Sequence, residues 1–345
     1  MSTPDVRSPP PRGVHVSQGR PLGPGASRGA VRLWLRSGVP RPLGPLALLR
    51  RQPRPGPKRA VEVAHRDPIL RRHPKAAELD RLGYGTIWLP GGSGAESLSL
   101  VDACLAAIRR IVVASGILSV WTNGAPDVAA THAALARRYP GRILLGLGVS
   151  HPHLVEQETG HRFEHPVAVM RRYLAALGAT ATDAPRDELV LAALGPRMLA
   201  LARDRVWGAH PYFVTPEHTR LARFVLGPGR LLAPEQAVVL ETDPDRARAI
   251  ARRHVAMYLR APNYTNNLLR LGFREGDCAS DGSDRLVDAV VAWGDVAAIG
   301  RRIEEHLVAG ADHVCLQVIA AAPDALPLAE WRTLAAFIGA GGASQ

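Results

Sequence analysis

Seven short apolar runs recur along the chain after Pro74, and a segment with helical spacing of apolar residues precedes each of them. The runs are continuous and do not alternate with polar positions, which is typical of strands buried on both faces of a parallel sheet. We therefore predict strands at residues 86–89, 111–117, 142–149, 189–194, 208–212, 236–241 and 312–318.

Several of the helical segments have clear starting signals. Thr215-Pro216, Asp243-Pro244 and Gly195-Pro196 each place a residue compatible with an N-cap before a proline at the first helical position. Two or three helices are expected between residue 241 and the last strand. The other helices are predicted at residues 75–83, 98–109, 126–138, 166–177, 196–205, 216–226 and 328–338.

This alternation predicts an α/β fold, the (β/α)8 TIM barrel, which typically occupies about 250 residues. Only seven strands are legible, so the first strand is expected to be atypical or missing: it comes from the first 73 residues, with residues 31–35 as a candidate, or is absent. A doubly wound open sheet is the competing architecture. Against it, no Gly-x-Gly-x-x-Gly segment follows the first legible strand, and seven crossovers in one chain favour closure.

Composition divides the chain into two parts. Residues 1–73 hold 13 of the 29 prolines, with arginines interleaved among them. Proline removes hydrogen-bond donors and blocks helices, and like charges repel, so a largely disordered or loosely attached leader is predicted there. The barrel domain is assigned to residues 74–340. As a hypothesis, such an Arg- and Pro-rich segment also arises when a GC-rich gene is read out of frame or from a wrong start.

The net charge of +12 belongs to the leader. Residues 1–75 contain 16 Lys and Arg against 3 Asp and Glu, whereas the remainder has 27 basic and 28 acidic residues. A nucleic-acid-binding face needs its positive charge on the folded domain, so the distribution argues against a nucleic-acid partner.

Cysteine usage and hydropathy argue against a secreted protein and against a membrane-spanning one. The three cysteines lie far apart without a Cys-x-x-Cys pair, which is typical of a reduced cytoplasmic protein. The sequence has neither the apolar core of a signal peptide nor an apolar stretch of about 18 residues. We therefore expect a cytoplasmic protein without a membrane-spanning segment.

The most informative motif lies at the end of the predicted strand 142–149. There Gly146 and Gly148 are followed by Val149, Ser150 and His151. Glycine weakens a strand unless something must approach the backbone closely. A flat ring lying over the strand end is one such partner, and large neighbouring side chains inside the barrel are another. The two interpretations stand equal on this evidence.

A second motif follows the strand 189–194, where Gly195 turns and the helix starts with Pro196, Arg197 and Met198. Free amides and the helix dipole favour a phosphate there, and barrel phosphate sites cluster after late strands. An ordinary capped helix is the alternative.

Further candidates stand at other strand ends. A glycine in Ser115-Gly116-Ile117 is compatible with a bulge or an unusual peptide bond. His210 and Tyr212 end another strand, although a structural role is commoner for a single histidine. Residues 263–267 precede the last strand and either cover a site or link two helices.

Together these segments resemble the superfamily of luciferase-like monooxygenases and deazaflavin-dependent oxidoreductases, in particular an actinobacterial-type branch that uses coenzyme F420. The resemblance covers Pro74 to Ala320 and fails before about Ala76. It is carried by residues 82–90, 139–151, 194–199, 208–212 and 311–315.

The resemblance implies a function. We expect an oxidoreductase that transfers a hydride between the deazaflavin F420 and a small organic substrate, or else an FMN-dependent monooxygenase. Members of this superfamily tend to dimerise, so a homodimer is expected. By resemblance, Ser115, Gly116 and Ile117 form a bulge behind the ring, often with a non-proline cis peptide.

The remaining roles follow from the same resemblance. Residues 146–150 line the ring and its side chain, and the turn at residues 195–198 takes the cofactor phosphate. His151, His210 and Tyr212 face the substrate as candidate catalytic residues.

Two functions of other classes remain open. His151-Pro-His153 has the His-x-His spacing of a zinc-dependent barrel hydrolase. In such hydrolases the pair belongs to the first strand, whereas here it follows the fourth, so no metal is expected. The unusual leader also leaves room for a catalytically defective relative.

Overall fold

The computed structural model describes residues 59–62, 74–91, 94–180, 186–322 and 326–340. All of them lie in one unit, residues 43–345. Eleven strands form a sheet in which every pairing is parallel. They are β1 (Arg59–Glu62), β2 (Thr86–Pro90), β3 (Val112–Gly116), β4 (Leu118–Ser119), β5 (Ile143–Gly148), β6 (Leu189–Leu191), β7 (Gly208–Ala209), β8 (Leu231–Leu232), β9 (Glu235–Val239), β10 (Val291–Trp293) and β11 (Val314–Val318).

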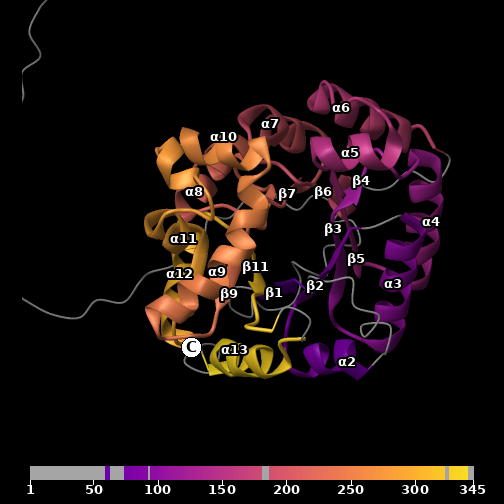
Figure 1. Cartoon of the computed structure of the whole chain (residues 1–345). Coiled ribbons are helices and arrows are strands. Elements are labelled where there is room, and N and C mark those ends of the chain that lie inside the picture. Colours follow the sequence, from indigo (N-terminus) through magenta and orange to yellow (C-terminus); the bar gives the residue numbers. More distant parts are fainter. Residues whose placement is uncertain (1–58, 63–73, 92–93, 181–185, 323–325, 341–345) are drawn as a thin grey trace, which may run out of the picture. The chain divides into compact units, whose positions relative to one another are not determined.

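Helices lie on the outside of these strands (Figure 1). They are α2 (Pro74–Arg81), α3 (Gly94–Ala107), α4 (Ala125–Arg138), α5 (Pro152–Thr159), α6 (Pro166–Gly178), α7 (Pro196–Arg205), α8 (Pro216–Leu226), α9 (Pro244–Leu259), α10 (Pro262–Arg270), α11 (Asp284–Val290), α12 (Val296–Val308) and α13 (Leu328–Ala340), with the 3₁₀ helices η3 (Arg186–Glu188) and η4 (Glu275–Cys278).

The sheet closes into a barrel at β8 and β9, two short strands separated by a segment that contains Pro234. β8 pairs with β7, and β9 pairs with β11. Between them, Pro234 lacks an N–H group, yet its neighbours continue the ladder: Ala233 N–H donates to Ala209 O and Glu235 N–H donates to Pro211 O. β8 and β9 therefore occupy one barrel position, as β3 and β4 do, and the eight-stranded barrel prediction is confirmed.

The first barrel strand is β1, which lies between β11 and β2. Its register places Ala60 opposite both Cys315 and Thr86. The candidate segment 31–35 lies outside the described residues, as does most of the predicted leader. Because β1 falls within residues 1–73, the exact boundary between leader and barrel stays a prediction.

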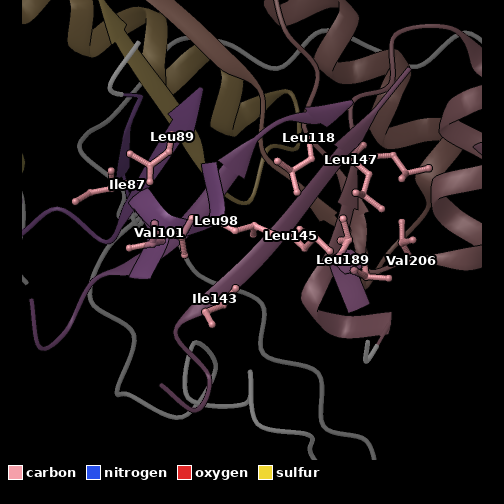
Figure 2. Close-up of a cluster of buried hydrophobic side chains, with 14 of the residues drawn as sticks. Ile87, Leu89, Leu98, Val101, Leu118, Ile143, Leu145, Leu147, Leu189 and Val206 are labelled. Carbon is pink, nitrogen blue, oxygen red and sulfur yellow. The ribbon is translucent and has the colours of Figure 1, made fainter. Parts of the chain in front are cut away.

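Residues of the strands are apolar on both faces because each face packs on a different layer. Ile87, Leu89 and Leu145 belong to the large cluster between the sheet and the helices, part of which Figure 2 shows. Trp88 and Leu144, one residue along, belong to a small cluster within the barrel. Side chains alternate between faces along a strand, so burial of both faces produces the continuous apolar runs.

The helix starts agree with the prediction. The Thr215 side chain accepts a hydrogen bond from His218 N–H, and the Asp243 side chain accepts one from Arg246 N–H. At α7 the cap is Gly195, without a side-chain hydrogen bond. The sequence did not predict α5, β8 or β10, and the described residues between residue 241 and β11 hold four α-helices, α9 to α12, where two or three were expected.

The described helices include none that is both long and apolar enough to cross a lipid bilayer.

Replacement of Gly208 by Ala should destabilise the barrel. A Cβ atom there would lie 1.9 Å from Leu231 O on β8, so the backbone must shift. Overpacking of this kind costs about 1–3 kcal/mol, and thermal unfolding followed by circular dichroism should show a midpoint lower by several degrees. Gly276→Ala is the matched control, since its Cβ has nothing within 4 Å. Equal midpoints for the two variants would contradict the close approach of β7 and β8.

Candidate active site

The carboxyl end of β3 carries a bulge. Ala114 pairs with Leu144 on β5, and Leu118 of β4 pairs with Leu147. Three residues, 115–117, therefore face two residues of β5, which is the insertion of one extra residue that defines a bulge. The peptide bond Gly116-Ile117 is cis, as expected from the resemblance.

Gly146 and Gly148 make room for this bulge. A Cβ atom on Gly146 would lie 2.0 Å from Ser115 O, and one on Gly148 would lie 2.4 Å from Ile117 Cδ1. The Ser115 hydroxyl also donates to Gly146 O (3.0 Å) and accepts from Gly146 N–H (2.9 Å). The surroundings of these two glycines agree with the interpretation that they accommodate large neighbouring groups. Contact with a cofactor stays a prediction.

Gly91, which sequence reasoning missed, completes this packing. It directly follows β2, and a Cβ atom on it would lie 1.5 Å from Ile117 O. Ile117 thus packs against glycines on two sides while keeping part of its surface exposed. A glycine after a strand is a weak signal in a sequence with 33 glycines, so only the fold identifies this one.

Below the bulge, His210 lies inside the barrel. Its ring stacks on Trp88 with centroids 3.9 Å apart, and its Nδ1 donates to Ala233 O at 2.7 Å. Nε2 lies 3.7 Å from Oε2 of the buried Glu235. Burial lowers the pKa of His210 to about 4, although the hydrogen bond to Ala233 acts in the opposite direction. A neutral imidazole therefore supports the bulge near neutral pH, with Nε2 3.7 Å from the Cβ position of Gly116.

His151 lies at the mouth, where β5 ends. Ser150 before it has φ 57°, a left-handed conformation that is uncommon outside glycine and turns the chain. The His151 ring contacts Tyr264 of α10, and its Nδ1 lies 3.2 Å from Asn263 Oδ1. Burial lowers the pKa of His151, and the bond to Asn263 partly offsets that effect. Residues 263–267 are thus helical, and two of them reach the strand end.

Tyr212 lies at the mouth beyond β7, within a group of aromatic rings. Its hydroxyl donates to Gln317 Oε1 (3.1 Å) and lies 3.3 Å from His254 Nε2. The ring packs edge-on against Tyr258 of α9 and Tyr264 of α10. α10 therefore spans from the end of β5 to the end of β7.

His254 and Gln317 were not found from the sequence. His254 lies on α9, and burial lowers its pKa to about 4. Gln317 lies near the end of β11 and is 4% exposed. Gln317 is the single polar residue of an apolar strand, whereas His254 lies on a helix rich in arginine, and neither has a distinctive local motif.

At the start of α7, Gly195 meets a guanidinium group from α10. Arg270 Nη2 lies 3.8 Å from the Cβ position of Gly195 and donates to Asn267 Oδ1 at 3.3 Å. Pro196 has no N–H group and Met198 N–H donates to Gly195 O at 3.1 Å, so the Arg197 amide and the helix dipole are what this turn offers an anion. Together with Arg270 they make a site that could bind an anion, which we call the phosphate corner. The sequence indicated residues 195–198 of this site but not Arg270. In that turn Arg197 is exposed and Met198 is buried.

The His-x-His pair has no further ligand among the described residues. The rings of His151 and His153 are 6.0 Å apart and nearly parallel. Within the described ranges, no three His, Cys, Asp or Glu side chains gather in a way that could hold a metal ion.

Comparison with known families agrees with this arrangement. The family model of the luciferase-like monooxygenases matches residues 65–313, which is most of the chain. The chain belongs to the luciferase-like monooxygenase family. As a member of this family it is an oxidoreductase. A search of curated protein sequences gives no significant match.

Solved structures share the fold at low sequence identity. An F420-dependent secondary alcohol dehydrogenase, in complex with an F420-acetone adduct, superposes with TM-score 0.64 and 15% identity, covering 82% of this chain and 99% of its own. The coenzyme F420 dependent tetrahydromethanopterin reductase from Methanopyrus kandleri gives 0.58 and 16%, with coverages of 80% and 96%. The oxygenating constituent of 3,6-diketocamphane monooxygenase from Pseudomonas putida, in complex with FMN, gives 0.60 and 13%, with coverages of 81% and 96%.

The buried histidines make this luciferase-like chain sensitive to mild acid. Burial lowers the pKa of His210 and His254 to about 4 and that of His306 to about 3. The unfolded chain binds these protons below pH about 6.5, whereas the folded protein does not until about pH 4. Protons therefore favour unfolding, and the free energy of unfolding should fall between pH 7 and pH 5 by more than about 1 kcal/mol per pH unit.

Urea denaturation at pH 7, 6 and 5 measures this slope. His306→Gln removes one of the three groups and should flatten it, whereas His161→Gln, at an exposed position, should leave it unchanged. Equal free energies of unfolding at pH 7 and pH 5 would rule out neutral buried histidines as the cause.

Proposed function

We propose that the chain is a coenzyme F420-dependent oxidoreductase that transfers a hydride between the deazaflavin and a small organic substrate. The bulge at residues 115–117, at the carboxyl end of the barrel, is the observation that carries this proposal. It leaves one face of Ile117 exposed at the mouth, and Gly146 and Gly148 hold no side chain that would displace it.

The ring of the cofactor would rest on this bulge. Ser115, Gly116 and Ile117 would lie behind it, and Gly146, Gly148, Val149 and Ser150 would flank it along β5 and the turn that follows. When bound, the deazaflavin supplies or accepts the hydride. The protein residues supply a rigid backing, because the Ser115 hydroxyl ties the bulge to β5.

The phosphate of the cofactor would bind at the start of α7. Gly195, Pro196, Arg197 and Met198 form the turn, whose Arg197 amide and helix dipole favour an anion. Arg270 supports this assignment, since it adds a permanent positive charge beside Gly195. Figure 1 shows α7 and α10 next to each other.

The substrate would bind on the other side of the ring, beneath α10. His151 and Tyr212 would face it, since both lie at the mouth and both contact Tyr264. His210 is buried below the bulge, so its contribution would be to hold the bulge and the ring in place.

An FMN-dependent monooxygenase is the alternative within the same family. It is favoured by the structural relative that binds FMN, and the phosphate corner suits either cofactor. Titration of the full chain with F420 and with FMN, followed by absorbance near 420 nm and 450 nm respectively, decides between them. Tighter binding of F420 supports the proposal, whereas exclusive binding of FMN overturns it.

Arg270→Gln should weaken cofactor binding by about tenfold or more, because a hydrogen bond to a charged group contributes about 1.5–3 kcal/mol. The dissociation constant from the same titration measures this loss. Arg171→Gln on the exposed face of α6 is the matched control and should bind as the wild type does. If both variants lose the same affinity for the cofactor, or if neither loses any, Arg270 does not bind the phosphate.

A further inference from the structure

The outer faces of α8 and α12 carry three exposed apolar side chains. Phe224 of α8 is 88% exposed, Val308 of α12 is 77% exposed, and Leu221 of α8 is 48% exposed. Within the described ranges only two other large apolar side chains are exposed, Met257 on α9 and Leu269 on α10. Scattered apolar residues are normal on a surface, whereas a contiguous group marks an interaction site. The arrangement of α8 against α12 therefore decides whether the three residues form a site.

Two contacts define this arrangement, and Figure 1 shows the two helices on the same side of the barrel. The Thr219 hydroxyl lies 2.8 Å from His306 Nδ1, and Arg223 Nε donates to Gly310 O at 2.8 Å. Both contacts join positions that are 87 residues apart in the sequence. This constant offset means that the two helices run in the same direction, and it places each residue of α8 level with the residue 87 positions later.

With this offset the three apolar residues form one group. Leu221 lies level with Val308, and Phe224 lies about one turn further along α8. All three point away from the barrel, because the opposite faces of both helices are buried against it. The group lies near the carboxyl ends of the helices, since α8 ends at Leu226 and α12 at Val308.

Four exposed charged residues continue this surface towards the helix starts. On α8, the acidic Glu217 precedes the basic Arg220. On α12, the basic Arg301 precedes the acidic Glu304. The charges therefore follow in opposite order on the two helices, and on each helix the apolar residues come last. We call these residues together the α8/α12 surface; they are residues 217, 220, 221, 224, 301, 304 and 308.

We propose that the α8/α12 surface binds a second copy of the chain across a two-fold axis parallel to the two helices. Such an axis places α8 of one copy against α12 of the other at the same level, and every contact occurs twice. Leu221 and Phe224 of one copy then pack on Val308 of the other. This contact removes from water the two most exposed large apolar side chains of the described residues.

The charged residues fit the same arrangement. Glu217 of one copy lies level with Glu304 of the other, and these two carboxylates alone would repel each other. Arg220 lies about one turn after this pair on α8, and Arg301 lies about one turn before it on α12, so each carboxylate has a guanidinium group of the other copy nearby. The opposite order of charges on α8 and α12 is what allows the surface to pair with itself.

The proposed contact leaves both active-site mouths open. Helices of the barrel start at the carboxyl ends of the strands, where the mouth lies, and the apolar group lies at the other ends of α8 and α12. The axis parallel to the helices makes the two mouths face the same direction. Dimer formation therefore does not depend on cofactor binding, and this inference stands apart from the proposed function.

The test is sedimentation equilibrium of the full chain without cofactor. Two helices per copy make an interface at the small end of the specific range, so we expect a dissociation constant of about 1–10 µM. Phe224→Glu should raise this constant about a thousandfold, because each of the two copies of the residue loses a contribution of the size of a hot spot. Met257→Glu is the matched control, since Met257 is 59% exposed on α9 outside the surface, and it should leave the dimer intact.

An exchange of charges tests the pairing itself. Arg220→Glu should raise the dissociation constant about tenfold, because like charges then meet across the interface. Adding Glu304→Arg to the same chain should restore most of the lost affinity, since an acidic α8 then faces a basic α12 of the other copy.

A wild-type chain that stays monomeric well above the expected dissociation constant overturns the proposal, and so does a dimer that Phe224→Glu leaves intact. A double variant that dimerises as weakly as Arg220→Glu alone overturns the pairing of the charges. Circular dichroism checks that each variant keeps its fold. If Phe224→Glu does not fold, Val308→Glu makes the same test from the other helix.

Discussion

One extra residue between β3 and β4 determines the geometry of the mouth. The bulge at residues 115–117 brings Ser115 O and the Ile117 side chain into the space that side chains on β5 would fill. A Cβ atom on Gly146 would lie 2.0 Å from the backbone oxygen of Ser115, so only glycine fits there; one on Gly148 would lie 2.4 Å from the end of the Ile117 side chain, which would have to move. The lack of a side chain at position 146 therefore permits the shape of the neighbouring strand, and the lack of one at position 148 gives Ile117 its place.

Local signals explain what the sequence predicted correctly. A proline after Thr215 or Asp243 marks a helix start through the chemistry of one or two residues, and both caps are present. Strands such as β2 and β5 are apolar runs buried on both faces, so they were visible without knowledge of their partners. β1 is different: with the sequence Arg-Ala-Val-Glu it is short and carries charged residues at both ends. Its place in the sheet follows from pairing with β11 and β2.

The parts of the site that the sequence missed depend on contacts between distant elements. His254 and Gln317 lie 42 and 105 residues from Tyr212, and Arg270 reaches Gly195 from another helix. No spacing rule links such positions, because the geometry arises only when α9 and α10 cross the strand ends. Strand-end residues such as Tyr212 were accessible to sequence reasoning, since the carboxyl ends of barrel strands meet at one face.

Two layers of side chains lie one above the other inside the barrel. His210 and Tyr212 are two residues apart in an extended segment, so their side chains share a face and differ in depth by about 7 Å. Cys315 and Gln317 bear the same relation on β11. In the lower layer, His210 on Trp88 is buried, and burial lowers its pKa, so the imidazole is neutral. The upper layer brings the Tyr212 hydroxyl and the Gln317 carboxamide into a hydrogen bond of 3.1 Å, which links the segment after β7 to β11.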